Sequence, residues 1–263
     1  MTSGSRILGY RIKDLLRNLP FYDYLKHQIC YRFKLLKRTD YLRANLESRL
    51  KKKEAIRPFE LYRLVPDNIN QAFTGNLFKL YFSPVVAGEW DKDCESLETF
   101  DIIYSFQNHF NEGTSWEETD FYSRALSCIN DGREWVGWGK LDTPKDLDDY
   151  LDRIETLFIR IKREGYKTQN CLQSEKENSI WVRNSRALEL HEVTVHIDRE
   201  GQILLEDGWH RLSMSKILGL ESIPVRIAYR HKNWQKIREK VLRTGEIPEE
   251  YEGHPDLTAL LED

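Results

Sequence analysis

The stretch from residue 189 to 228 constrains the fold more than any other part of the chain. Apolar and polar residues alternate from Val193 to Asp198, a pattern of period two that is typical of a strand with one buried face. A turn at Glu200–Gly201 follows, and the apolar run 203–205 then predicts a second strand. Residues 223–227 predict a third strand with a proline near its start.

A glycine corner separates the second of these strands from a helical pattern. Residues 207–211 read Asp-Gly-Trp-His-Arg, and the helix behind them is expected to end at Gly219. Unpaired N–H groups at a helix start attract anions, and the helix dipole adds to this attraction. Gly208 allows the backbone to approach a ligand, His210 and Arg211 can donate to phosphate oxygens, and Asp207 can hold a metal ion or accept a proton. The corner therefore predicts a phosphate-binding site.

The same corner also has a purely structural interpretation. In that alternative Asp207 caps the helix, His210 packs in the protein interior and Arg211 is solvated. Glycine corners of this kind are common, so the spacing of the residues does not decide between the two interpretations.

The sequence DGWHRLSMSKILGLESIPV, within residues 186–228, resembles the core motif of the ParB/sulfiredoxin superfamily. ParB-type clamps that bind CTP carry Gly-Glu-Arg-Arg at this corner, and sulfiredoxins carry Gly-Gly-Cys-His-Arg. The archaeal free serine kinases, which use ADP, carry Asp-Gly-His-His-Arg, and this version is the most similar to residues 207–211. Trp209 stands in place of the first kinase histidine and of the sulfiredoxin cysteine, which argues against sulfiredoxin chemistry.

The resemblance implies an α+β fold with a mixed sheet and helices. It also implies a nucleotide-binding protein, expected to be a kinase-like phosphotransferase that acts on a small hydroxylated metabolite or a sugar. The nucleotide would be ATP, ADP or CTP, with Mg²⁺. Two alternatives stay open: a nucleotide switch or clamp of the ParB type, and a protein that binds or cleaves nucleic acid.

The resemblance also suggests roles for individual residues. Glu192, upstream of the corner, is a candidate general base, and Asp207 would assist it or bind Mg²⁺. Lys167 and Gln169 correspond to a loop that the superfamily places near its nucleotide. The expected site residues are Asp207, Glu192 and His210 for catalysis, and Gly208, Trp209, His210, Arg211, Lys167 and Gln169 for nucleotide and phosphate binding.

Charge and periodicity divide the chain into two parts. Residues 1–58 are expected to form a basic helical arm, since residues 1–60 hold 15 Lys and Arg against six Asp and Glu. Residues 59–263 would form the ParB/sulfiredoxin-like domain, with a helical insertion at about 94–165. The basic arm suggests contact with nucleic acid, an anionic surface or the acidic remainder of the chain. The alternative is a solvated arm that packs through its aromatic and leucine residues.

Several local signals predict helix ends. Thr143 is a suitable N-cap with Pro144 at the first helical position, and Ser115 with Glu118 matches a capping box. Asn233 is expected to cap a helix near the end of the chain, and the acidic tail from residue 247 is expected to cover the surface.

The remaining composition indicates a cytoplasmic protein. The sequence has no apolar run long enough to span a membrane, and its first residues lack a signal-peptide core. Four cysteines lie far apart, without the spacing of a zinc site, so reduced thiols are expected.

Overall fold

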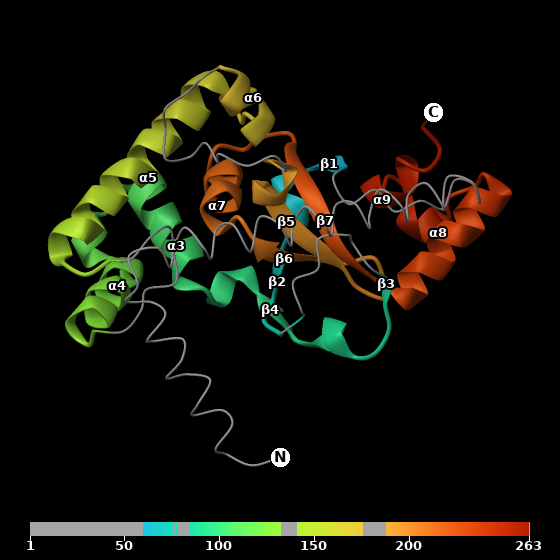
Figure 1. Cartoon of the computed structure of the whole chain (residues 1–263), viewed down its shortest axis with the longest axis horizontal. Coiled ribbons are helices and arrows are strands. Elements are labelled where there is room, and N and C mark those ends of the chain that lie inside the picture. Colours follow the sequence, from blue (N-terminus) through green and yellow to red (C-terminus); the bar gives the residue numbers. More distant parts are fainter. Residues whose placement is uncertain (1–59, 76, 78–84, 133–140, 176–187, 263) are drawn as a thin grey trace, which may run out of the picture. The chain divides into compact units, whose positions relative to one another are not determined.

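A computed structural model describes residues 60–75, 77, 85–132, 141–175 and 188–262. They belong to one compact unit, Ile56–Asp263, which combines a mixed sheet with helices (Figure 1). The expected α+β class is therefore confirmed. The basic arm at 1–58 and the first residues of the motif core lie outside the described residues. Within the described part, every helix is too short or too polar to cross a lipid bilayer.

The sheet has the strand order β1-β7-β5-β6-β2-β4, and β3 also pairs with β7. The pairs β1–β7, β2–β4 and β5–β6 are antiparallel, whereas β2–β6, β3–β7 and β5–β7 are parallel. The strands are β1 Leu61–Leu64, β2 Gln71–Phe73, β3 Val85–Val86, β4 Cys94–Ser96, β5 Val193–Ile197, β6 Ile203–Asp207 and β7 Ile223–His231.

The three strands predicted from the motif core are all present as neighbours. Strand β5 lies between β6 and β7, and every residue of β5 and β7 is buried. The prediction that β5 has only one buried face is therefore wrong, since Thr194 and His196 are buried too. A strand that is covered on both faces needs little polar alternation. This explains why β7 is longer than the apolar pattern at 223–227 suggested.

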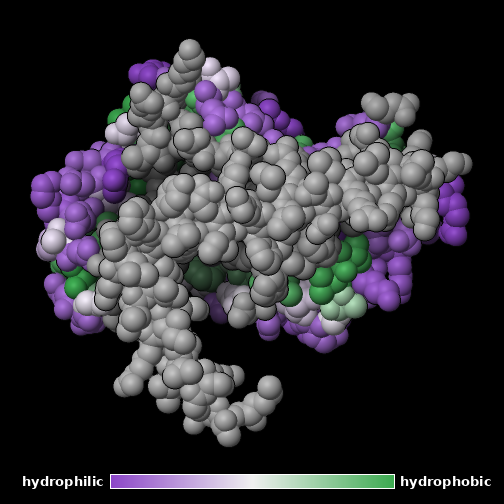
Figure 2. All heavy atoms as spheres, in the orientation of Figure 1, coloured by the Kyte–Doolittle hydropathy of each residue, from purple (hydrophilic) through white to green (hydrophobic). Residues whose placement is uncertain are grey.

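The helices are α3 Asp101–Gln107, α4 Asp120–Asn130, α5 Pro144–Glu164, α6 Gln169–Ser174, α7 Trp209–Ile217, α8 Lys232–Thr244 and α9 Pro255–Thr258. Helices α3 and α5 contact α7, and α3, α4 and α5 lie on the other side of α7 from α8 and α9 in Figure 1. Hydrophilic residues cover much of the visible surface over α4 and α5 (Figure 2), as expected for amphipathic helices with their apolar faces turned inward.

One of the three predicted helix caps is confirmed and two are wrong. Thr143 caps α5, in a capping box with Asp146. The side chain of Ser115 makes no capping bond, however, and α4 begins instead after Thr119, whose side chain accepts from the N–H of Tyr122. At the other end of the chain, His231 rather than Asn233 caps α8.

The helical insertion begins later than the expected residue 94. Cys94–Ser96 forms the edge strand β4, because its backbone pairs with β2. The first helix of the insertion is α3, which starts at Asp101 and continues into a π-helical turn at Asn108–Glu112. The insertion therefore consists mainly of α3, α4 and α5.

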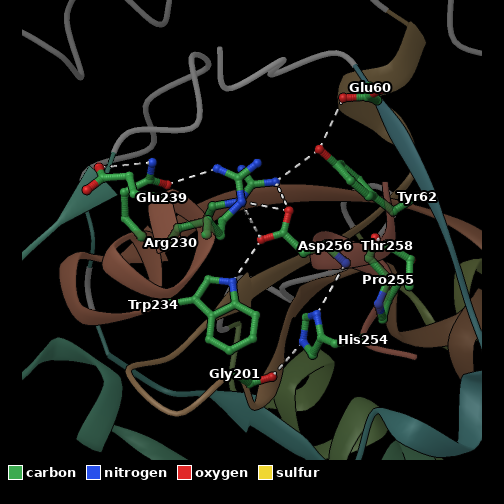
Figure 3. A network of polar contacts seen from close by, with 12 residues as sticks. Glu60, Tyr62, Gly201, Arg230, Trp234, Glu239, His254, Pro255, Asp256 and Thr258 are labelled. Carbon is green, nitrogen blue, oxygen red and sulfur yellow. Dashed lines mark hydrogen bonds and ion pairs between the residues drawn. The ribbon is translucent and has the colours of Figure 1, made fainter. Parts of the chain in front are cut away.

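The acidic tail lies mostly at the surface, as expected, but two residues of α9 anchor it in the core. Asp256 of α9 is fully buried, as is the neighbouring Leu257. The Asp256 carboxylate accepts from the Arg230 guanidinium at 2.6 Å and from Trp234 Nε1 at 2.8 Å (Figure 3). Arg238 Nε lies 3.2 Å from the same carboxylate. Two arginines of β7 and α8 thus share one counter-ion that α9 supplies.

Candidate functional site

The glycine corner lies where β6 ends and α7 begins. Gly208 has φ +93°, and a Cβ atom at this position would lie 2.8 Å from the Cα of Val193. Asp207 Oδ1 accepts a hydrogen bond from the N–H of Gly208 at 2.7 Å, which holds the carboxylate at the corner. Glycine is required here both by its positive φ and by the close approach of β5.

A cavity of about 390 Å³ opens beside this corner. Its volume lies in the range of small-molecule sites. Five of the residues predicted from the sequence line it, and they come from three separate segments: Asp207 and Gly208 at the corner, Arg211 on α7, and Lys167 and Gln169 near the start of α6. The fold therefore brings together residues that lie up to about 40 positions apart in sequence.

Arg211 is fixed in place by contacts on several sides. Its Nη1 donates to Glu192 Oε2 at 2.9 Å, and its Nη2 donates to the carbonyl oxygen of His191. The guanidinium lies 5.7 Å from the ring centroid of Tyr166. Such a cation is held ready for an anionic ligand with little further loss of side-chain freedom.

Glu192, the candidate general base, is buried and holds three neighbouring groups. Its side chain is 1% exposed. Besides Arg211, it accepts from the N–H of Gln169 at 2.6 Å and from Tyr166 Oη at 3.2 Å. Glu192 is absent from the cavity lining. A base must reach the proton that it removes, and this carboxylate instead ties α6 and the preceding loop to α7.

His210 faces the helical insertion and not the cavity. Its Nε2 lies 2.6 Å from Tyr150 Oη of α5, and its ring contacts Phe106 and Phe121. Burial, with a further contribution from Arg211, lowers the pKa of His210 to about 3. The ring is thus neutral at physiological pH. The prediction that His210 contacts phosphate does not fit this position. His210 packs in the protein interior, as the structural interpretation of the corner suggested.

Trp209 also turns away from the cavity. Its ring packs on Phe100 with the centroids 4.7 Å apart, and it does not line the cavity. Trp209 was expected to bind the nucleotide, and in the structure it packs next to α3 instead.

Lys167 and Asp207 are the accessible charged groups that the sequence indicated. Lys167 Nζ lies 3.0 Å from Glu175 and 3.1 Å from Glu164, and these carboxylates raise its pKa. Asp207 is exposed and contributes the one acidic side chain of the cavity lining. Among the described residues, no group of three or more His, Cys, Asp and Glu side chains is placed to bind a metal ion.

No family model, curated protein or solved structure matches this chain. The function is therefore inferred from the site itself.

Sequence reasoning missed the wall of the cavity that α5 provides. Arg153, Leu157, Arg160 and Ile161 line the cavity from this helix, and His191 and Tyr166 add to the lining. The two arginines lie beside the apolar stripe of α5, where a helical pattern suggests solvated charges. With Lys167 and Arg211, they bring the cations of the lining to four, beside the carboxylate of Asp207. Carboxylates outside the lining pair with three of these cations: Glu192 with Arg211, Glu164 with Arg160, and Glu164 and Glu175 with Lys167. A lining with this many donors can bind an anionic group.

Proposed function

We propose that this protein is a nucleotide-dependent phosphotransferase of the ParB/sulfiredoxin type. The observation that carries the proposal is the convergence of Gly208, Arg211, Lys167 and Asp207 on one cavity of ligand size. The nucleotide would be ATP, ADP or CTP, and the acceptor would be a small molecule with a hydroxyl group.

The phosphates of the nucleotide would lie at the start of α7. This helix is nine residues long, and its first turn offers N–H groups and the positive end of its dipole. Arg211 and Lys167 add charge on the same lining. Both are held by carboxylates behind them, so their heads are positioned before a ligand arrives.

In the transfer step, the acceptor oxygen forms a bond to the terminal phosphorus while the bond from that phosphorus to the leaving nucleotide oxygen breaks. The hydroxyl proton passes to the carboxylate of Asp207, the acidic side chain of the lining. Mg²⁺ would be bound by phosphate oxygens and water, and it would neutralise phosphate charge.

The test combines Asp207→Asn with product detection. The asparagine oxygen can still accept from the N–H of Gly208, so the corner should remain folded. We expect the variant to lose phosphorylated product in a mixture of ATP, ADP or CTP, Mg²⁺ and hydroxyl compounds. The nucleotide should still raise its melting temperature. Asp152→Asn, which changes an exposed carboxylate of α5 outside the cavity, is the matched control. Unchanged turnover in Asp207→Asn would remove the proposed role.

A second candidate is a nucleotide switch without phosphoryl transfer. The position of Glu192 favours it, because the upstream carboxylate is buried and paired and leaves Asp207 as the one acid on the lining. A nucleotide at 100 times its Kd should stabilise the protein by about 2.7 kcal/mol. At roughly 2–4 °C per kcal/mol this gives a melting rise of about 5–11 °C. Such a rise without product from any acceptor would favour the switch. The basic arm, on which the nucleic-acid alternative rests, lies outside the described residues.

A further inference from the structure

His254 connects the last helix of the chain to the turn between β5 and β6 (Figure 3). It is the N-cap of α9, and its Nδ1 accepts from the N–H of Asp256 at 3.2 Å. Its Nε2 lies 3.0 Å from the carbonyl oxygen of Gly201. The His254 ring also packs on the Trp234 ring of α8, with the centroids 4.5 Å apart. One side chain thus joins three separate parts of the fold.

A single protonation state of His254 satisfies both of its hydrogen bonds. A backbone N–H can only donate and a carbonyl oxygen can only accept, so Nδ1 must carry a lone pair and Nε2 must carry the proton. A second proton would lie on Nδ1 and face the N–H of Asp256, where two donors would then oppose each other. The cap of α9 therefore requires a neutral imidazole.

The charged groups around His254 also act against a positive ring. Burial lowers the pKa of His254, and Arg230 of β7 and Arg238 of α8 lower it further, whereas Asp256 raises it. The Asp256 carboxylate already accepts from Arg230 and Trp234, and Arg238 lies 3.2 Å from it. Its attraction for a protonated His254 is therefore largely offset by the two arginines that it neutralises.

We propose that His254 is an acid-sensitive latch, whose neutral ring holds α9 on the domain and whose protonation releases α9. The ring is partly exposed, so a proton can reach it. Helix α9 is only four residues long and is held by its two buried residues, Asp256 and Leu257. Its release would withdraw the shared counter-ion from β7 and α8. The latch is independent of the proposed function, because His254 lies outside the cavity lining.

The direction of the pH response follows from the lowered pKa of His254. In the released segment the ring has its ordinary pKa of 6.5, so it takes up a proton at a higher pH than the ring in the closed state does. The latch is therefore fully effective above pH 6.5 and weakens as the pH falls below it. A closed state that stays unprotonated at pH 5 gives the upper limit, a rise of about 30-fold in the opening constant of α9.

Hydrogen exchange followed by mass spectrometry measures this opening in the full-length protein. Amides of α9 are compared at pH 7.5 and pH 5 after correction for the intrinsic pH dependence of exchange, and amides of α5 report on global unfolding. We expect the opening constant of α9 to rise by roughly 10- to 30-fold at the lower pH. His254→Asn should abolish this rise, because asparagine can cap a helix but does not titrate.

His231→Asn is the matched control, because His231 caps α8 in the same way. Its Nδ1 accepts from the N–H of Asn233 at 3.1 Å, and its Nε2 lies 3.0 Å from the carbonyl oxygen of Gly88. This variant should keep the acid response of α9. A rise that persists in His254→Asn overturns the proposal. Exchange of α9 and α5 amides at one common rate at pH 5 also overturns it, since that rate would report global unfolding.

A titration of the native protein decides the question if His254→Asn does not fold. Nitrogen-15 NMR of the imidazole should show the Nε2–H tautomer at pH 7.5. Protonation of His254 should then coincide with the loss of exchange protection in α9. A ring that becomes protonated while α9 stays protected would show that the cap tolerates the charge, and the latch would be refuted.

Discussion

Replacing Gly208 by alanine tests the corner on which the site is built. Gly208 has φ +93°, and the new Cβ would lie 2.8 Å from the Cα and 2.9 Å from the Cγ2 of Val193. The first of these atoms is backbone in the buried strand β5, so a rotamer change cannot relieve the contact. Either β5 or the start of α7 must move.

The two costs can be added from the geometry. An L residue in the left-handed region costs roughly 1–2 kcal/mol, and forcing extra volume into a packed interior costs roughly 1–3 kcal/mol. We therefore expect Gly208→Ala to lower the free energy of unfolding by about 3 kcal/mol. For a domain of this size, that corresponds to a fall in melting temperature of roughly 6–12 °C.

Gly219→Ala is the matched control, because Gly219 follows the other end of α7. It has φ +59° and nothing within 4 Å of a built Cβ. In this variant only the backbone strain should lower stability, by about 1 kcal/mol in the free energy of unfolding or roughly 2–4 °C in the melting temperature. Thermal and urea unfolding of both variants measures the difference. Equal losses in the two variants would refute the tight approach of β5 to the corner.

Three further changes test neighbouring contacts. Because burial lowers the pKa of His210 to about 3, the unfolded state takes up the proton first as the pH falls. Stability is therefore present above the ordinary pKa of 6.5 and lost between pH 6.5 and 3. The loss between pH 7.5 and 5 should be about 2 kcal/mol smaller in His210→Gln, and equal urea curves would contradict this. Asp256→Ala leaves Arg230 and Arg238 without their carboxylate and should cost about 3–5 kcal/mol in urea unfolding, whereas the exposed Glu252→Ala should change little. Glu192→Gln should lower stability by about 1–3 kcal/mol; a variant that is fully stable but inactive would restore its role as a base.

Local signals were sufficient to predict the corner and the strands beside it. The position of strand β5, the glycine corner at Gly208 and the cap at Thr143 depend on residues close together in sequence, although the alternation in β5 wrongly suggested one exposed face. The convergence of Lys167 and Gln169 on the cavity was also predicted, but through the resemblance and not through any local pattern.

The orientation of the α7 side chains and the contribution of α5 to the cavity depend on packing between elements that lie far apart in sequence. On α7, the side chain of His210 points toward Tyr150 and that of Arg211 points toward Glu192. Adjacent residues of a helix point in different directions, and only the packing of neighbouring elements decides which of them faces the cavity. Arg153 belongs to the cavity only because α5 contacts α7. In sequence it looks like any charge at the edge of an amphipathic helix.

The ion pair between Arg230 and Asp256 has a consequence for synthesis on the ribosome. The two residues are 26 positions apart. At translation rates of roughly 5–20 residues per second, the arginine precedes its carboxylate by roughly one to five seconds. During this interval a nascent β7 would have to bury a cation without its counter-ion. Strand β7 is therefore expected to dock late, after α9 has emerged. A fragment that stops before Asp256 should fold poorly and be cleaved readily by proteases.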